Sequence, residues 1–261
     1  MTHLTAARDA VVCPRPVPGA RQRLFLFHHA GGSHLAFRSW VPLFPPEWEI
    51  CLMEAPGRGA LLGAPPLDTV ESLVAFFEEA IEPWADRPMA FFGHSMGALV
   101  AHELAHALVG NGLVAPSWLG VSACPPPRRA GPGSTQPPVP GPLTDDALRR
   151  RLITLGGTPP ELLTDSRLWS MFAPALRADF TATATYRQPP GRLGPAVPLS
   201  VFAGRDDPAA SPGELTGWAP ATGARPARFH VFPGGHFYLD THREQVAARI
   251  VADATEHLPP R

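Results

Sequence analysis

The sequence contains no lysine, because all 22 of its basic side chains are arginine. This absence excludes enzymes that form a Schiff base through a lysine, pyridoxal phosphate enzymes included, and it excludes the P-loop nucleotide site. Net charge is also small, since 23 acidic residues bring the formal charge to −1. We therefore expect neither a nucleic-acid partner nor an anionic membrane surface as a partner.

Cysteine is scarce and scattered. The three cysteines, Cys13, Cys51 and Cys124, lie far apart and form no Cys-x-x-Cys pair. An odd number of separated cysteines argues against a disulfide framework and favours a cytoplasmic protein. Cys124 is a candidate nucleophile, although a buried thiol is the more common role for such a residue.

Long apolar runs are missing as well. No stretch approaches the roughly 20 apolar residues that a membrane-spanning helix needs. The first residues, Met1–Gly19, carry charged side chains and three prolines where a signal peptide would carry an apolar core. We expect no membrane association and a frayed N-terminal segment.

Short apolar runs that alternate with helix-like segments are the main pattern of the chain. Thr69–Trp84 has apolar residues at a period of about 3.6, which predicts an amphipathic helix with Thr69 as its cap. Further helices are predicted over Ala98–Val109 and about Arg243–His257. Such alternation is typical of an α/β protein whose mostly parallel sheet is covered on both faces. The predicted strands are Arg23–Phe27, Glu49–Met53, Met89–Gly93, Pro116–Ala123, Pro198–Ala203 and Arg228–Phe232.

A helical insertion interrupts this pattern at about residues 125–188 of what we expect to be one domain over 1–261. It begins with Pro125–Pro142, which is rich in proline and glycine and predicts an irregular loop. Helices are then predicted over Asp145–Leu155 and Ser166–Tyr186, with Pro174 breaking or bending the second one. The apolar face at Leu168–Phe180 either lines a substrate cavity or packs on the sheet as ordinary core.

The run Gly93-His94-Ser95-Met96-Gly97 matches G-x-S-x-G. In this motif a sharp turn from strand to helix lifts the serine hydroxyl above the sheet edge, and the flanking glycines let the strained backbone pass. An apolar strand precedes the motif and a helix-forming run follows it, as the motif requires. The pattern predicts Ser95 as the nucleophile of an α/β-hydrolase fold.

A serine nucleophile needs a histidine base, and the histidine needs an acid that fixes its tautomer. In this fold the chain order is serine, acid, histidine. His236 follows the last predicted strand, where a loop delivers it to the sheet edge, whereas His230 and His242 are expected on the surface. Asp206 and Asp207 are both candidates for the acid, and the fold favours Asp207.

The oxyanion of a tetrahedral intermediate needs backbone N–H donors. One donor is expected at Met96, which follows the nucleophile at the start of a helix. The other is expected from the turn His29-Ala30-Gly31-Gly32 after the first strand, and we assign it to Ala30.

A rival motif, His102-Glu103-Leu104-Ala105-His106, matches the H-E-x-x-H signature of zinc proteases. Its histidines share a helix face, but the helix is the one that Ser95 begins, and no third ligand is evident in the sequence. We therefore expect no metal ion and no cofactor.

The chain resembles the type II thioesterases that accompany polyketide and non-ribosomal peptide synthases. Several linked segments, which together span roughly Leu24 to Leu239, carry the resemblance. They are His29-Ala30-Gly31-Gly32-Ser33, Pro56-Gly57-Arg58-Gly59, Gly93-His94-Ser95-Met96-Gly97-Ala98, Leu155-Gly156-Gly157-Thr158-Pro159, Pro174-Ala175-Leu176-Arg177-Ala178-Asp179-Phe180 and Phe232-Pro233-Gly234-Gly235-His236-Phe237.

The resemblance implies an editing enzyme that hydrolyses acyl thioesters on the phosphopantetheine arm of an acyl or peptidyl carrier protein. The family's nucleophile, acid and base fall on Ser95, Asp207 and His236, and its oxyanion donors fall on Ala30 and Met96. The insertion corresponds to the family's lid. Residues expected to contact the acyl group are Met171, Phe172, Phe180 and Phe237.

The sequence alone leaves alternative interpretations of one arginine run and of the function. Arg149-Arg150-Arg151 either meets an acidic carrier protein or forms a solvated helix face, and the second is favoured. A general carboxylesterase or lipase of the same fold is the alternative enzyme. A non-catalytic binding module is the alternative from another class, although serine, acid and histidine are all present. We expect a monomer.

Overall fold

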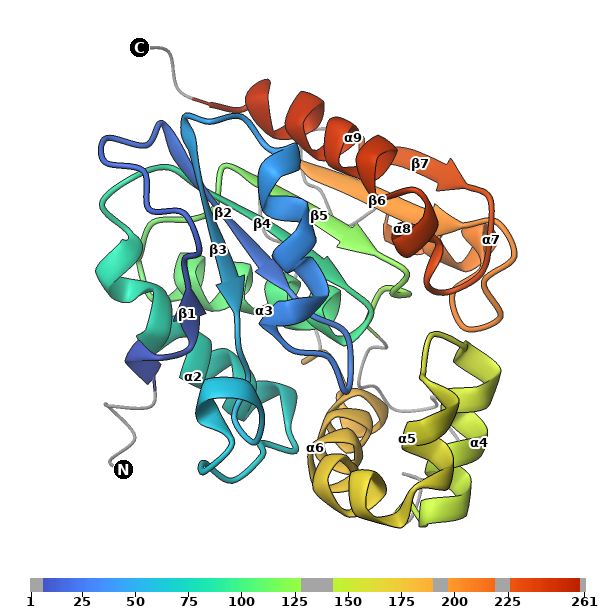
Figure 1. Cartoon of the computed structure of the whole chain (residues 1–261). Helices are drawn as coiled ribbons and strands as arrows, with labels where there is room; N and C mark the ends of the chain where they lie inside the picture. The colour runs from blue at the N-terminus through green and yellow to red at the C-terminus, as the bar shows by residue number, and fades with distance from the viewer. Residues whose placement is uncertain (1–6, 128–142, 190–196, 219–225, 259–261) are drawn as a thin grey trace.

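The computed structural model describes residues 7–127, 143–189, 197–218 and 226–258, and it shows a central sheet with helices on both faces (Figure 1). Seven strands within these ranges form the sheet in the order β1-β3-β2-β4-β5-β6-β7. Neighbouring strands from β2 to β7 are parallel, and β1 runs antiparallel to β3. The strands are β1 (Val11–Val12), β2 (Gln22–Phe27), β3 (Trp48–Met53), β4 (Met89–His94), β5 (Trp118–Ser122), β6 (Leu199–Gly204) and β7 (Arg228–Phe232).

Burial explains why continuous apolar runs predict these strands. Every residue of the five strands from β2 to β6 is buried, as expected for a parallel sheet with helices on both faces. The edge strand β7 differs, because Phe229 and Val231 are exposed. All six predicted strands are present, and their ends shift by two residues at most.

Two clusters of buried apolar side chains lie on opposite faces of the sheet, and β2 contributes alternate residues to each. Helices α2 (Val70–Ile81) and α3 (Met96–Gly110) cover one face. The 3-10 helix η1 (His34–Leu43) and helix α9 (Arg243–Thr255) cover the other. This two-sided arrangement is the α/β-hydrolase fold that the sequence predicts.

The cap predicted for α2 is confirmed, since the Thr69 hydroxyl accepts a hydrogen bond from the Ser72 N–H at 3.2 Å. Outside the insertion, the short helices in the described ranges include η2 (Gly59–Leu61), η3 (Glu82–Trp84), α7 (Pro212–Leu215) and α8 (Tyr238–Thr241).

A buried polar cluster fastens α9 to the sheet. Asp253 of α9 accepts hydrogen bonds from the Ser200 hydroxyl at 2.6 Å and the Arg228 guanidinium at 3.0 Å, and its carboxylate lies 2.7 Å from His230 Nε2. Trp118 extends the cluster by donating to the Ser200 oxygen at 3.0 Å. Burial acts to raise the pKa of Asp253, but these hydrogen bonds outweigh it and lower the pKa to about 2.

The helical insertion, which we call the lid as the sequence suggests, consists of α4 (Asp145–Leu155), α5 (Pro160–Thr164) and α6 (Ser166–Thr185), which stand between β5 and β6 in the chain and together form a bundle (lower right in Figure 1). The lid has its own apolar cluster, which includes Leu148 and Trp169. Helix α6 continues through Pro174, so of the two predicted effects of this proline the break is wrong. Most of the predicted loop Pro125–Pro142 lies outside the described residues.

The N-terminal segment corrects a second expectation. Ala7 and Ala10 are buried, and β1 pairs with β3, with Val11 opposite Met53. The described part of the N-terminal segment is therefore packed on the sheet and is not frayed. No helix in the described ranges is both long and apolar enough to cross a membrane.

Candidate active site

Ser95 occupies the sharp turn between β4 and α3. Its φ is +55°, and Ser95 and Ala123 are the two non-glycine residues with positive φ in the described part of the chain. A Cβ on Gly93 would lie 2.1 Å from the Gly97 carbonyl oxygen, and a Cβ on Gly97 would lie 2.2 Å from the Phe27 carbonyl oxygen. Both contacts involve backbone, so Gly93 lets the turn close tightly on the start of α3 and Gly97 lets it pass close to β2.

The structure brings Ser95, His236 and Asp207 together from three separate loops. The His236 Nε2 lies 3.0 Å from the Ser95 Oγ, and the His236 Nδ1 lies 2.8 Å from the Asp207 Oδ2. Because the ionised carboxylate can only accept, it holds the proton on Nδ1 and leaves Nε2 to accept the serine proton. This is the arrangement of a nucleophile with its general base.

The two aspartates after β6 are clearly distinguished. Asp207 is buried, and its second oxygen, Oδ1, accepts from the N–H groups of Ala209 at 2.8 Å and Ala210 at 3.2 Å. Asp206 is exposed. The carboxylate that faces His236 is therefore that of Asp207, and local backbone donors fix its orientation.

Both predicted oxyanion donors lie beside the nucleophile. Ala30 and Met96 line the same cavity as Ser95, and neither N–H donates to another protein atom among the described residues. Met96 is the first residue of α3, where the helix leaves its N–H groups unpaired and the helix dipole favours negative charge.

The buried ring of His94 lies beside His236. The His94 ring is 5.2 Å from the His236 ring, centroid to centroid, and the His94 Nδ1 lies 2.8 Å from the Ser122 hydroxyl, which lies 2.6 Å from the Tyr238 hydroxyl. Burial, followed by repulsion from neighbouring histidines, holds the pKa of His94 well below its ordinary value. His94 is therefore neutral at physiological pH. Its hydrogen bond with Ser122, which in turn contacts the Tyr238 hydroxyl, fixes the orientation of the His94 ring.

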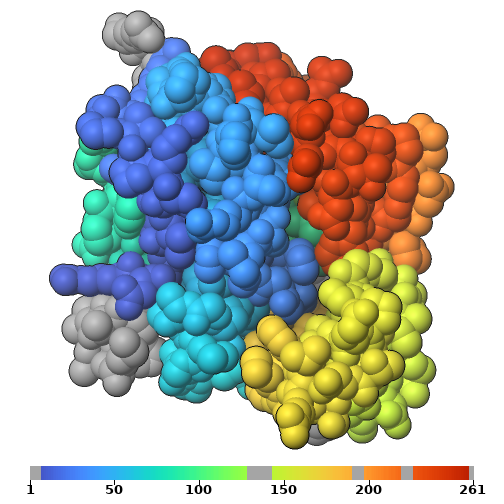
Figure 2. Space-filling view, in the orientation of Figure 1, coloured from blue at the N-terminus to red at the C-terminus, as the bar shows by residue number. Residues whose placement is uncertain are grey.

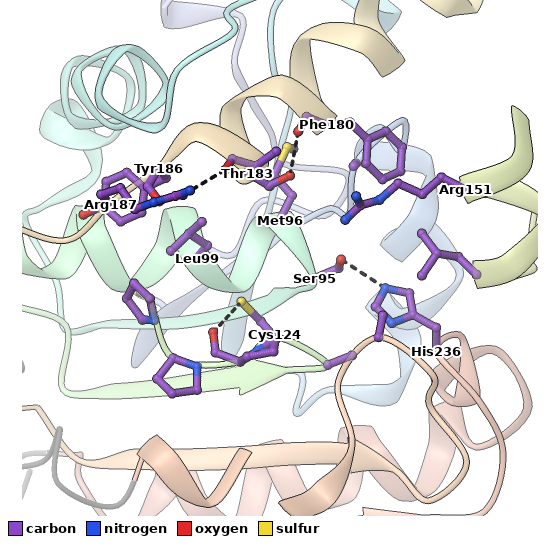
Figure 3. A pocket seen from close by; sticks show the side chains of 18 residues that line it. Ser95, Met96, Leu99, Cys124, Arg151, Phe180, Thr183, Tyr186, Arg187 and His236 are labelled. Atoms are coloured by element: carbon purple, nitrogen blue, oxygen red, sulfur yellow. Dashed lines mark hydrogen bonds between the residues drawn. The ribbon is translucent and has the colours of Figure 1, made fainter. Parts of the chain in front are cut away.

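Two cavities meet at Ser95. The larger, of about 340 Å³, runs from the nucleophile past Met96 and Leu99 to Tyr186 and Arg187 (Figure 3). The smaller, of about 120 Å³, runs under the lid and has a more apolar lining. Residues common to both linings are Ala30, Ser95, Leu155, Phe180 and His236.

The four residues predicted to contact the acyl group divide into two pairs. Phe180 lines both cavities and Phe237 lines the smaller one. Met171 and Phe172 are 56% and 43% exposed and line neither cavity, which corrects the sequence expectation for these two. Counting along α6 gives the reason, because the buried stripe begins at Trp169 and leaves Met171 and Phe172 on the outer side. The stripe comprises Trp169, Ala173, Leu176 and Phe180.

The zinc-like motif at His102 and the thiol of Cys124, the other candidates from the sequence, have no sign of catalytic function in the described part of the chain. The His102 Nδ1 lies 3.0 Å from the Glu103 carboxylate, and the His102 ring packs edge to face on His106 and Trp218. No group of three or more His, Cys, Asp or Glu side chains in the described ranges is arranged to hold a metal. Cys124 lines the larger cavity, but burial raises the pKa of its thiol to about 12, so the thiol is not an activated nucleophile.

The arginines of α4 also have partners within the lid. The Arg149 guanidinium lies 4.1 Å above the Trp169 ring, and that of Arg151 lies 5.1 Å above the Phe180 ring. Arg151 lines the larger cavity, while Arg150 is exposed. The three arginines therefore do not form one uniform basic surface.

A buried ion pair beside the site is a feature that sequence reasoning missed. Arg58 and Asp179 pair through two hydrogen bonds of 2.6 and 2.8 Å although they lie 121 residues apart in the chain. Both residues belong to segments that carry the resemblance described above. That shared membership was a signal of importance, but nothing in the spacing indicated that the two segments meet.

Comparison with known proteins identifies the family. The family model of the thioesterase domain matches residues 22–253. Gramicidin S biosynthesis protein GrsT of Aneurinibacillus migulanus is 33% identical, with 92% of this chain and 91% of the relative covered. Thioesterase PikA5 of Streptomyces venezuelae is 35% identical, with 93% and 83% covered.

Solved structures agree with these relatives. RedJ, a thioesterase from the prodiginine biosynthetic pathway of Streptomyces coelicolor, superposes with a TM-score of 0.78 at 32% identity, covering 92% of this chain and 91% of RedJ. YbtT, a type II thioesterase from the yersiniabactin pathway, superposes with a TM-score of 0.79 at 30% identity, covering 96% and 100%. The chain belongs to the thioesterase domain family.

Proposed function

We propose that this chain is a type II thioesterase that hydrolyses acyl thioesters from the phosphopantetheine arm of acyl or peptidyl carrier proteins. YbtT is a type II thioesterase of a combined non-ribosomal peptide and polyketide pathway, and GrsT is a gramicidin S biosynthesis protein, which supports this substrate class. The observation that carries a hydrolytic mechanism is the continuous hydrogen-bonded row from Ser95 through His236 to Asp207.

In the proposed mechanism Ser95 Oγ attacks the thioester carbonyl while His236 Nε2 takes its proton. Asp207 holds the other ring nitrogen and stabilises the imidazolium that forms. The carbonyl oxygen becomes an oxyanion, and we assign the N–H groups of Ala30 and Met96 as its hydrogen-bond donors. His236 then gives its proton to the departing thiol, which leaves an acyl ester on Ser95.

Water completes the cycle by the same steps. His236 takes a proton from water, the hydroxide formed attacks the acyl ester, and Ser95 leaves with the proton returned by His236. Burial, followed by repulsion from neighbouring histidines, holds the pKa of His94 well below its ordinary value, so the His94 ring adds no competing positive charge beside the imidazolium.

The two cavities suit the two parts of the substrate. The thioester must lie with its carbonyl at Ser95, so the acyl group and the arm extend in different directions from this point. The smaller cavity, lined by Leu152, Leu162 and Leu176, suits the acyl group, and the larger one, which contains Arg151 and Thr183, suits the amide-rich arm. We further propose that the enzyme acts as a cytoplasmic monomer.

Replacement of Ser95 by alanine tests the proposal. The variant should fold normally and lose hydrolysis of acyl-carrier thioesters, since no acyl-enzyme can form without the hydroxyl. Parallel assays with acyl-pantetheine and a nitrophenyl ester separate the thioesterase from the general esterase. Turnover retained by the folded alanine variant would exclude Ser95 as nucleophile, and a preference for the oxygen ester would exclude the proposed substrate class.

A further inference from the structure

Three segments that are distant in the sequence meet under the lid. The first is the turn from His29 to Gly32, closed by a hydrogen bond of 2.9 Å from the Gly32 N–H to the His29 carbonyl, with Gly31 at φ +75°. A positive φ at the third residue of such a turn is the type II conformation, which glycine adopts without steric cost. The Gly31 N–H does not close the turn, so it is available to an acceptor on another segment.

The acceptor of that N–H is a buried carboxylate on the lid. Asp179 of α6 is fully buried, and its Oδ2 accepts from the Gly31 N–H at 2.7 Å. The same carboxylate accepts two hydrogen bonds from the Arg58 guanidinium, from Nη1 to Oδ2 at 2.6 Å and from Nη2 to Oδ1 at 2.8 Å. Its charge is thus compensated by a bidentate pair, which fixes its orientation as well as its position.

Arg58 belongs to the segment that follows β3, and it ties the turn a second time. Its Nη1 donates to the Gly32 carbonyl at 3.2 Å as well as to Asp179. Leu176, one turn earlier on α6, closes the junction, because a Cβ on Gly31 would lie 2.2 Å from its Cδ2. Figure 2 shows the cyan segment after β3 lying against the yellow lid, and the Arg58–Asp179 pair joins these two parts.

We infer that Asp179, oriented by Arg58, is a positioning residue that holds the turn in the geometry that aims the Ala30 N–H at the oxyanion. Ala30 and Gly31 share one peptide unit, so a restraint on the Gly31 N–H also restrains ψ of Ala30. The inference rests on the proposed role of Ala30 as an oxyanion donor. Because Asp179 is part of the lid, the oxyanion site is complete only when α6 is seated.

A purely structural ion pair is the competing explanation, and steady-state kinetics separates the two. We expect Asp179→Ala to lower kcat about 10- to 100-fold with KM changed less than threefold, a smaller loss than removing a donor outright causes. Asp179→Asn keeps an acceptor for Gly31, so its kcat should lie between those of the wild type and the alanine variant. Arg58→Lys keeps the charge but loses the bidentate geometry, and should also lower kcat.

A transition-state mimic gives a readout that stability does not affect. A trifluoromethyl ketone analogue of the substrate adds to the serine and forms an oxyanion, whereas the matching acyl amide does not. Affinity for the ketone should fall in the Asp179 and Arg58 variants by the same factor as kcat, and affinity for the amide should not change. Arg58 acts partly through Asp179 and partly through its own hydrogen bond to the Gly32 carbonyl, so the double variant Arg58→Lys, Asp179→Ala should lose less kcat than the product of the two single losses.

Glu49→Gln is the matched control, because it breaks another buried arginine–carboxylate pair, with Arg23, at the opposite ends of the strands. It should lower the melting temperature and leave kcat unchanged. The inference is overturned if the Asp179 and Arg58 variants keep wild-type kcat, or if ketone and amide lose affinity equally. A Ser95→Ala variant that stays active would instead overturn the proposed function, so the two failures are distinguishable.

Discussion

Replacing Asp207 with asparagine removes the charge at the end of the hydrogen-bonded row and preserves its shape. The surrounding backbone decides which way the new amide faces. The Oδ1 position accepts N–H groups from Ala209 and Ala210, so the asparagine carbonyl must stay there. The amide NH2 then faces the His236 Nδ1, where the carboxylate Oδ2 now lies at 2.8 Å.

That orientation forces the wrong tautomer on His236. Facing a donor, Nδ1 must become the acceptor, and the proton moves to Nε2, which can no longer accept from Ser95. A triad in this state loses about 10⁴ in kcat in the serine protease template. This factor corresponds to about 5.4 kcal/mol of lost transition-state stabilisation, at about 1.36 kcal/mol for each factor of ten.

The assay follows thiol release from acyl-pantetheine with a chromogenic disulfide, and the adjacent Asp206→Asn variant is the control. Asp206 is exposed, so its variant should keep kcat within about twofold. Both variants should have wild-type circular dichroism, because asparagine retains the backbone hydrogen bonds at position 207. A loss smaller than tenfold for Asp207→Asn, or an equal loss for Asp206→Asn, would refute the assignment of the acid.

Four further outcomes follow from the structure. Gly97→Ala should destabilise the fold by about 1–3 kcal/mol and reduce activity, because the new Cβ would lie 2.2 Å from the Phe27 carbonyl oxygen. Gly110→Ala is the control, since no atom lies within 4 Å of a Cβ there, and it should be neutral or stabilising. Urea unfolding measures the stability of both variants. The lowered pKa of Asp253, about 2, gives stability that is present above its unfolded pKa of about 3.9 and is lost as the pH falls towards 2. Asp253→Asn should therefore lower the unfolding free energy at pH 7 by about 2 kcal/mol and flatten its acid dependence, and an unchanged acid limb would contradict this. Leu162→Trp narrows the smaller cavity and should reduce kcat/KM for long acyl groups more than for acetyl; an equal effect on both would move the acyl site elsewhere. Activity should survive dialysis against a chelator, whereas a loss restored by zinc would support the metal motif at His102.

The sequence predicts the parts of the fold that are encoded locally. The strands β2 to β6 are continuous apolar runs because both of their faces are covered, and such runs are visible in the sequence alone. The two-residue strand β1 escapes prediction, since it is held by backbone pairing with β3 and needs no apolar pattern. The helix η1 escapes for a related reason, because a 3-10 helix with Pro42 inside it has no period of 3.6.

The candidate site divides in the same way. Ser95 and its glycines are predictable because the strained turn needs a local pattern. The sequence places two aspartates, Asp206 and Asp207, where the acid is expected. Which of the two carboxylates faces His236 depends on the folded geometry. The contact of Arg58 with Asp179 depends on how the lid packs, so no local pattern encodes it.

The chemistry of the substrate explains why positioning at this site matters more than help for the leaving group. A thiol departs easily, so formation of the tetrahedral intermediate is the step at which the protein can most affect the rate. Phe180, which lines both cavities, and Asp179, which restrains the oxyanion turn, are consecutive residues of α6. A displacement of α6 must therefore alter the substrate cavities and the oxyanion site together. If the lid moves during turnover, acyl preference and kcat should change together in variants that loosen it.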